Sequence, residues 1–294
     1  MNEIQLKNML DQARYLVEQG KLLHAVQVYH RILATEPQCL EASLELSSLY
    51  LESGNVGCAE EILQRAFEQS GKKSKIIFML GNLQLRRGNF DKAITYYKML
   101  DEKKMPEVHF NMGFAYFYKN NIKLAEHHLR LTMKYNPRFP KINESLGELL
   151  IKRRAYAEAI TYLKRGLQSD PYSCINHYLL GVAHAHLFDW QNAYDSFVTA
   201  IEMDPNEVSA WQMCGRALLR LRRLDEAKQY LRKAYDLNPH LPDTLVDFGH
   251  LHLQRGETDT ATRFFDKALE FDPGNPEATD GKVKVKILSK KYSC

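Results

Sequence analysis

The residues best suited to chemistry in this sequence are its eleven histidines, some of which lie close together along the chain. His184 and His186 are two residues apart, and so are His250 and His252. On a helix, side chains two residues apart point about 200° away from each other, whereas metal ligands on one helix need a spacing of three or four residues. We therefore expect no metal site.

Other reactive groups form no recognisable constellation. The five cysteines make no CxxC motif and no cluster with histidine, so we expect reduced thiols without a disulfide framework. The sequence also has no GxxxxGK(S/T) loop, no GxGxxG fingerprint after a strand and no GxSxG elbow. We expect neither an enzyme nor a bound cofactor.

The bulk composition is that of a folded chain with little charge bias. Of 294 residues, 45% are hydrophobic and 26% are charged, which argues against disorder. The net charge of +4 is far from the dense basic footprint of a dedicated nucleic-acid binder. No run of 18 apolar residues and no leader-like segment occurs, so we expect no membrane insertion and a cytoplasmic location.

An internal repeat is the main signal. Alanine recurs at intervals of 34 residues, with one interval of 32: Ala25, Ala59, Ala93, Ala125, Ala159, Ala193, Ala227 and Ala261. If this alanine is position 20 of a 34-residue unit, position 8 is always small: Ala13, Ser47, Gly81, Gly113, Gly147, Gly181, Gly215 and Gly249. Position 24 is always large: Tyr29, Leu63, Tyr97, Leu129, Leu163, Phe197, Leu231 and Phe265.

Each unit has the pattern of a helical hairpin. Two apolar helical stripes are separated by a short polar turn, and in six units a proline at position 32 ends the second stripe, as at Pro37 and Pro273. Small residues at positions 8 and 20 let the two helices approach closely, while the large residue at position 24 fills the space beside them. One hairpin cannot bury both of its faces, so neighbouring units must stack.

This pattern resembles the tetratricopeptide repeat family. The resemblance implies an all-α, right-handed superhelical solenoid of about eight helix-turn-helix repeats within residues 1–273. The repeats are placed at residues 6–39, 40–73, 74–105, 106–139, 140–173, 174–207, 208–241 and 242–275. The third repeat is two residues short, and Pro106 is expected to open the next helix. Residues 276–294 suit a capping helix with a short basic tail, although the alternating Lys and Val residues at 282–286 are also compatible with a strand.

The turn inside each hairpin departs from the family pattern in the middle of the chain. Position 15 is glycine at Gly20, Gly54, Gly88 and Gly256, but it is Asn120, Arg154, Phe188 and Arg222 in repeats 4 to 7. A left-handed backbone at a residue other than glycine costs about 1 kcal/mol. We therefore expect a different turn geometry in these four repeats.

The side of each first helix that is not committed to packing carries the candidate binding residues. In the resembling family this side lines a concave groove. In repeats 3 and 4 the candidates are Phe78, Asn82, Arg86, Phe110, Asn111, Phe114, Phe117 and Tyr118. In repeats 5 to 7 they are Lys152, Tyr178, Arg216 and Arg220. Aromatic anchors, asparagine amides and arginine forks would suit a peptide segment with apolar and acidic side chains.

These residues predict a non-catalytic scaffold or adaptor that binds a peptide segment of another protein. An alternative for Phe114, Phe117 and Tyr118 is packing between adjacent repeats, and an alternative for the arginines is a solvated face. At the level of function, the chain could instead be a structural subunit that self-associates or assembles through its outer face and ends. RNA reading by repeats requires polar residues at fixed inner positions of every repeat, and these columns are heterogeneous and often apolar.

Overall fold

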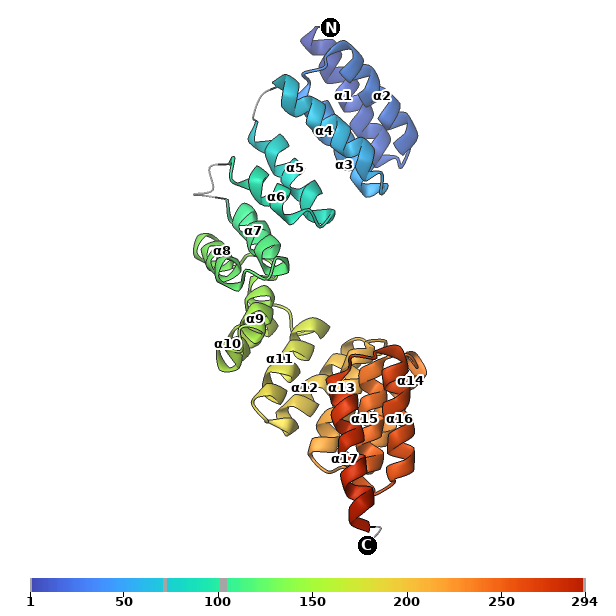
Figure 1. Cartoon of the computed structure of the whole chain (residues 1–294). Coiled ribbons are helices and arrows are strands. Elements are labelled where there is room, and N and C mark those ends of the chain that lie inside the picture. The colour runs from blue at the N-terminus through green and yellow to red at the C-terminus, as the bar shows by residue number, and fades with distance from the viewer. Residues whose placement is uncertain (1, 71–72, 101–104, 293–294) are drawn as a thin grey trace. The chain divides into compact units, whose positions relative to one another are not determined.

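The computed structural model describes residues 2–70, 73–100 and 105–292, and these segments are helical hairpins without a β-strand (Figure 1). The predicted all-α fold of stacked repeats is confirmed. The chain divides into two compact units, an N-terminal unit of residues 1–140 and a C-terminal unit of residues 141–294.

The N-terminal unit contains four hairpins. Its helices are α1 (Glu3–Glu18), α2 (Leu22–Thr35), α3 (Leu40–Glu52), α4 (Val56–Ser70), α5 (Ser74–Arg86), α6 (Phe90–Tyr97), α7 (Pro106–Tyr118) and α8 (Ile122–Tyr135). Pro106 is at the start of α7, as the sequence predicted, where its missing N–H is not needed by the helix. The residues 101–104 before it, where the third repeat is shortened, lie outside the described residues.

The C-terminal unit contains four hairpins and one further helix. Its helices are α9 (Ile142–Lys152), α10 (Tyr156–Ser169), α11 (Cys174–His186), α12 (Trp190–Met203), α13 (Val208–Arg220), α14 (Leu224–Leu237), α15 (Pro242–Gln254), α16 (Thr258–Phe271) and α17 (Pro276–Tyr292). The segment with alternating Lys and Val is helical, because it lies within α17.

Within each unit, first helices of successive hairpins contact one another and form a layer. Such contacts join α5 to α7 in the N-terminal unit, and α13 to α15 and α15 to α17 in the C-terminal unit. Figure 1 shows α15, α16 and α17 packed side by side at the C-terminal end of the described chain. We call the solvent-exposed side of this layer the first-helix face.

In the six hairpins with glycine at position 8, this glycine lies directly under the large residue at position 24. A Cβ atom added to Gly181 would lie 2.6 Å from a ring carbon of Phe197, and one added to Gly81 would lie 2.5 Å from the ring of Tyr97. Ala193 and Phe197 are fully buried in the same cluster. The predicted close approach of the two helices is therefore confirmed.

The expected difference in turn geometry is wrong. Asn120, Arg154, Phe188 and Arg222 have φ values of 58°, 64°, 60° and 62°, in the same left-handed region as the four glycines, whose φ values lie between 70° and 79°. The N–H of Arg154 reaches the carbonyl of Ile151, as the N–H of Gly88 reaches that of Leu85. Packing of the two helices imposes the turn, and its gain exceeds the local cost of about 1 kcal/mol.

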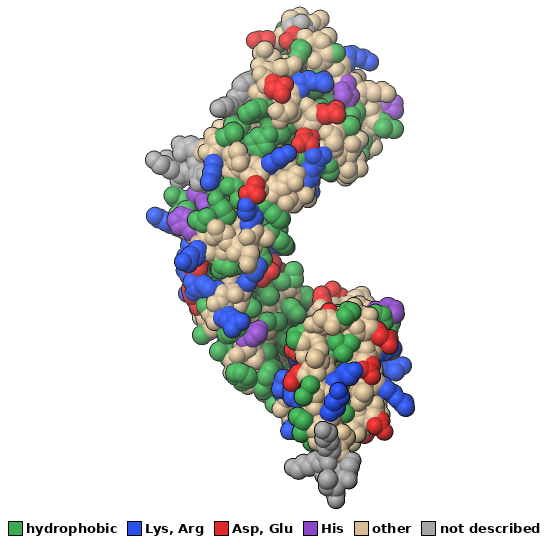
Figure 2. Space-filling view, viewed as in Figure 1, with side chains coloured by type: hydrophobic (Ala, Val, Ile, Leu, Met, Phe, Trp, Pro, Cys, Tyr) green, Lys and Arg blue, Asp and Glu red, His purple; other side chains and the backbone are tan. Residues whose placement is uncertain are grey.

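Helix α17 covers the last hairpin with its buried side. Ala278 and Val285 pack with Phe265 of α16 in one apolar cluster, while Val283 and Ile287 remain exposed. Figure 2 shows Lys and Arg side chains gathered over this part of the surface. Most of the exposed residues of the helix, among them Asp280, Lys284 and Lys286, are polar, as a terminal cap requires.

One buried contact in the N-terminal unit is polar. His109 of α7 and His128 of α8 are both buried, with their Nδ1 atoms 3.1 Å apart. In this hydrogen bond one Nδ1 donates and the other accepts, so only one of the two Nδ1 atoms carries a proton. Burial and the neighbouring His109 lower the pKa of His128 to about 4.

Candidate functional site

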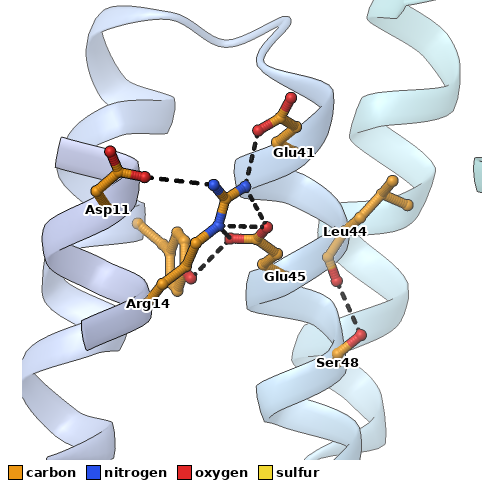
Figure 3. Close-up of polar contacts among 7 residues, drawn as sticks. Asp11, Arg14, Glu41, Leu44, Glu45 and Ser48 are labelled. Carbon is orange, nitrogen blue, oxygen red and sulfur yellow. Dashed lines mark hydrogen bonds and ion pairs between the residues drawn. The ribbon is translucent and has the colours of Figure 1, made fainter. Parts of the chain in front are cut away.

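A recurring polar contact joins first helices of adjacent repeats, from position 9 of one repeat to position 6 of the next. Its first example is Arg14 of α1, whose Nε donates to Oε1 of Glu45 on α3 at 3.0 Å. The Nη2 atom also donates to Glu45 at 2.7 Å and to Glu41 at 2.8 Å. Figure 3 shows the Arg14 side chain reaching across to these two carboxylates, with Asp11 beside it. Together the carboxylates raise the pKa of Arg14, so the guanidinium stays charged.

The second example joins α5 to α7 and is uncharged. Asn111 Nδ2 donates to Oδ1 of Asn82 at 2.8 Å, and the hydroxyl of the buried Tyr97 donates to the same oxygen at 2.7 Å. The Asn82 oxygen therefore has both of its lone pairs used. The Asn82 amide nitrogen and the Asn111 amide oxygen have no partner among the described residues.

The third example joins α13 to α15 and is largely buried. Arg216 Nε donates to the two carboxylate oxygens of Asp247 at 3.0 and 3.1 Å, and Gln212 also donates to Asp247. The Asp247 side chain is 3% exposed. Burial raises its pKa to about 6, although the Arg216 charge opposes this shift.

These contacts change the interpretation of three predicted binding residues. Asn82, Asn111 and Arg216 hold adjacent repeats together, and only part of each side chain remains for a ligand. Sequence reasoning missed Glu45 and Asp247, because a single repeat position does not show which side chain of the adjacent repeat it contacts. A comparison of position 9 with position 6 of the following repeat would have revealed the pairs Arg14–Glu45, Asn82–Asn111 and Arg216–Asp247.

Four aromatic side chains form a partly exposed cluster in the N-terminal unit, which we call the aromatic cluster: Phe90, Phe114, Phe117 and Tyr118. The Tyr118 ring stacks on Phe90 of α6 with centroids 5.5 Å apart, and it contacts Phe114 at 4.5 Å and Phe117 at 5.6 Å. Phe114 and Tyr118 nevertheless remain 40% and 56% exposed. The cluster thus combines packing between repeats with an accessible apolar surface.

Phe90 was not predicted as a site residue, although the repeat position that it occupies shows a recurring pattern. It occupies position 17, the start of the second helix, and Tyr118 occupies position 13 of the next repeat. The same pair of positions brings Tyr156 against His186, whose stacked rings are 4.5 Å apart. It also places the Arg220 guanidinium 5.6 Å from the ring centroid of Trp190. Position 17 therefore supports whichever side chain ends the next first helix.

Of the other predicted residues, three are packed against aromatic rings and two are exposed to solvent. Phe78 lies 6.2 Å from the Tyr97 ring, and Phe110 lies 4.9 Å from the Phe139 ring, so both are half-buried. Tyr178 is also half-buried and contacts Phe197. Arg86 and Lys152 are exposed.

The twelve predicted residues fall into two separate sets. The eight from Phe78 to Tyr118 belong to the N-terminal unit, and Lys152, Tyr178, Arg216 and Arg220 belong to the C-terminal unit. Each set therefore belongs to the surface of its own unit. In the described part of the chain, no group of three His, Cys, Asp or Glu side chains could hold a metal ion.

This architecture of packed helical hairpins, with aromatic side chains exposed in one unit and charged side chains exposed in the other, defines a helical-repeat interaction protein. Three tetratricopeptide repeat models match the chain. The first matches residues 16–70 and 218–284, the second residues 110–173 and 178–242, and the third residues 76–104. The chain belongs to the tetratricopeptide repeat family, whose members mediate protein–protein interaction and assembly. None of the matching models describes a catalytic family.

Two relatives are 28% and 23% identical to this chain over the aligned residues. BBSome complex member BBS4 of Bos taurus is 28% identical over 63% of this chain and 36% of its own length. Anaphase-promoting complex subunit 3 of Schizosaccharomyces pombe is 23% identical over 67% of this chain and 32% of its own length. The chain thus spans about a third of the length of these relatives.

Solved structures support the fold. The Cut9 and Hcn1 hetero-tetramer of the APC/C matches 97% of this chain and 57% of its own chain, with a TM-score of 0.67 and 16% identity. A tetratricopeptide repeat protein from Parabacteroides merdae matches 84% of this chain and 98% of its own, with a TM-score of 0.64 and 17% identity. Within the described residues, none of the helices combines the length and the apolar character needed to span a membrane.

Proposed function

We propose that this chain is a non-catalytic adaptor that binds a peptide segment of a partner protein on its first-helix face. The observation that carries the proposal is the aromatic cluster, where Tyr118 is held between Phe90 and Phe114 and still exposes 56% of its surface. A rigid aromatic side chain that stays accessible is a favourable anchor, because binding orders it little further.

The neighbouring amides suit the backbone of an extended segment. The Asn82 amide nitrogen offers donors and the Asn111 amide oxygen offers an acceptor, and their mutual hydrogen bond fixes both side chains. Apolar side chains of the partner would cover Phe114 and Tyr118, while its backbone pairs with these amides. We further propose that the adaptor acts in the cytoplasm, in line with the expectation from the sequence.

The test uses a peptide library selected on the wild-type chain and then measured individually by fluorescence polarisation. Phe114→Ala and Tyr118→Ala should each weaken a selected peptide by about 2 kcal/mol, or roughly 30-fold. Tyr172→Ala is the matched control, because Tyr172 is 77% exposed in the C-terminal unit. Peptides that bind both cluster variants as tightly as the control would refute the proposed surface.

Assembly into a larger complex is a second proposal. The bovine relative is named as a member of the BBSome complex and the yeast relative as a subunit of the anaphase-promoting complex. Sedimentation velocity over a hundredfold range of concentration tests whether the chain also binds copies of itself. A sedimentation coefficient that stays constant over the range would exclude self-association at those concentrations.

A further inference from the structure

A cavity of about 340 Å³ lies on the first-helix face of the C-terminal unit, among α13, α15 and the capping helix α17. Arg216 and Arg220 line it from α13, Asp247 from α15, and Glu277, Asp280 and Lys284 from α17. It thus gathers three cations and three carboxylates from three helices. The way these charges are paired shows which of them a ligand can reach.

The two carboxylates that contact Arg216 differ in exposure. Asp247 binds the Nε edge and is 3% exposed, so it is a fixed part of the fold. Glu277 accepts from Nη2 at 3.1 Å and its side chain is 53% exposed. Because exposed ion pairs are weak, the Glu277 carboxylate can leave Arg216 at little cost, whereas Asp247 cannot.

Arg220 supplies a second guanidinium on the same side of α13. It lies one helical turn after Arg216, and the Trp190 ring beneath it holds it at 5.6 Å. Arg220 forms no ion pair with any described residue. Lys284 already has a partner, because its Nζ is 2.5 Å from Asp280. The positive charge that remains for a ligand is therefore on Arg220 and on the outer edge of Arg216.

The half-buried His250 in the same cavity senses this positive charge. Burial lowers its pKa, and the charges of Lys284, Arg216 and Arg220 lower it further, while Glu277 acts in the opposite direction. The cations of the cavity and Glu277 thus act on His250 in opposite directions.

We infer that this cavity binds a carboxylate side chain of an acidic partner segment between Arg216 and Arg220, and that Glu277 occupies the outer edge of Arg216 until that segment arrives. Two guanidiniums oriented by Asp247 and Trp190 match the fork geometry of a carboxylate. The inference rests on the proposed function, since it gives the first-helix face of the C-terminal unit its own ligand chemistry. It makes Glu277 an internal competitor of the partner.

The experiment measures binding of fluorescein-labelled hexaglutamate to the full chain by fluorescence polarisation, with hexaglutamine as the neutral probe. Glu277→Gln should tighten hexaglutamate binding about fivefold, because it removes the internal competitor. Arg220→Gln should weaken it by at least about fivefold. Glu270→Gln is the matched control, since Glu270 is an exposed residue of α16 and its loss changes the net charge equally.

The inference is overturned if Glu277→Gln binds hexaglutamate no better than Glu270→Gln does. It is also overturned if Arg220→Gln binds like the wild type, if hexaglutamine binds as well as hexaglutamate, or if neither wild type nor Glu277→Gln binds. Circular dichroism and thermal melting confirm that each variant is folded. Failure of this inference can be distinguished from failure of the proposed function, because the proposed function is tested at Phe114 and Tyr118 in the other unit.

Discussion

Asn111 donates a hydrogen bond to Oδ1 of Asn82 across 2.8 Å, and the hydroxyl of Tyr97 donates to the same oxygen. The pair joins α5 to α7. One amide oxygen thereby satisfies a buried phenol and fixes the side chain of the next repeat.

Replacement of Asn82 is expected to cost more stability than replacement of Asn111. Asn82→Ala leaves the buried Tyr97 hydroxyl without its acceptor, which costs about 1–3 kcal/mol. Asn111→Ala keeps the Tyr97 bond and should cost less than about 1 kcal/mol. Urea denaturation followed by circular dichroism measures both values. Equal losses would contradict the assignment, and Tyr97→Phe should remove most of the Asn82→Ala penalty in the double variant.

Gly181 should tolerate no side chain, because its Cβ would lie 2.6 Å from the ring of Phe197. Gly181→Ala is expected to destabilise the C-terminal unit by about 1–3 kcal/mol through overpacking. Gly57 of α4 provides the control, since a Cβ there would meet no atom within 4 Å. Gly57→Ala should be neutral or stabilising by up to about 1 kcal/mol. Thermal melting compares the two variants. A lower melting temperature for Gly181→Ala but not for Gly57→Ala would show that the close contact with Phe197, and not alanine as such, causes the loss of stability.

The left-handed turn at Arg154, with φ of 64°, predicts a gain from glycine. Arg154→Gly should raise the free energy of unfolding by about 0.5–1 kcal/mol, because glycine adopts this backbone without a Cβ clash. The reverse change, Gly88→Ala at φ of 74°, should lower it by a similar amount. A loss of stability in Arg154→Gly would show that its side chain contributes more than the strain costs.

Acidification is expected to weaken the N-terminal unit through His128. The pKa of His128 is lowered from 6.5 to about 4 in the folded chain. Between these two pH values the unfolded chain binds a proton that the folded chain does not, so the free energy of unfolding falls as the pH drops from 6.5 to 4. The effect is on the order of 2 kcal/mol. His128→Gln should remove it, as measured by hydrogen exchange in α7 and α8.

In the C-terminal unit, acidification is expected to have the opposite effect on stability, through Asp247. Burial raises the pKa of Asp247 from 3.8 to about 6, so the folded chain binds a proton first as the pH falls. The contribution of Asp247 to stability therefore increases between pH 6 and pH 4. Hydrogen exchange in α13 and α15 should slow relative to α7 and α8 over this range. A parallel change in both units would contradict these two assignments.

Residue spacing alone determined the helical hairpins, their close contacts and the capping helix, because small residues at positions 8 and 20 and a large one at position 24 admit one local packing. Gly181 under Phe197 is an example that needs no knowledge of the neighbouring repeats. The sequence also identified the accessible aromatic residues Phe114 and Tyr118. Such local rules work because both partners of each contact lie within one hairpin.

Tertiary structure decided everything that depends on pairs of repeats. It joined Arg216 to Asp247, placed Phe90 under Tyr118 and brought Glu277 of α17 to Arg216. It also imposed the left-handed turn on Arg154 against the local preference of that residue. There are two physical reasons. Packing of the helices outweighs the conformational cost at single residues. In addition, the residue type at one repeat position does not show which side chain of the next repeat completes the contact.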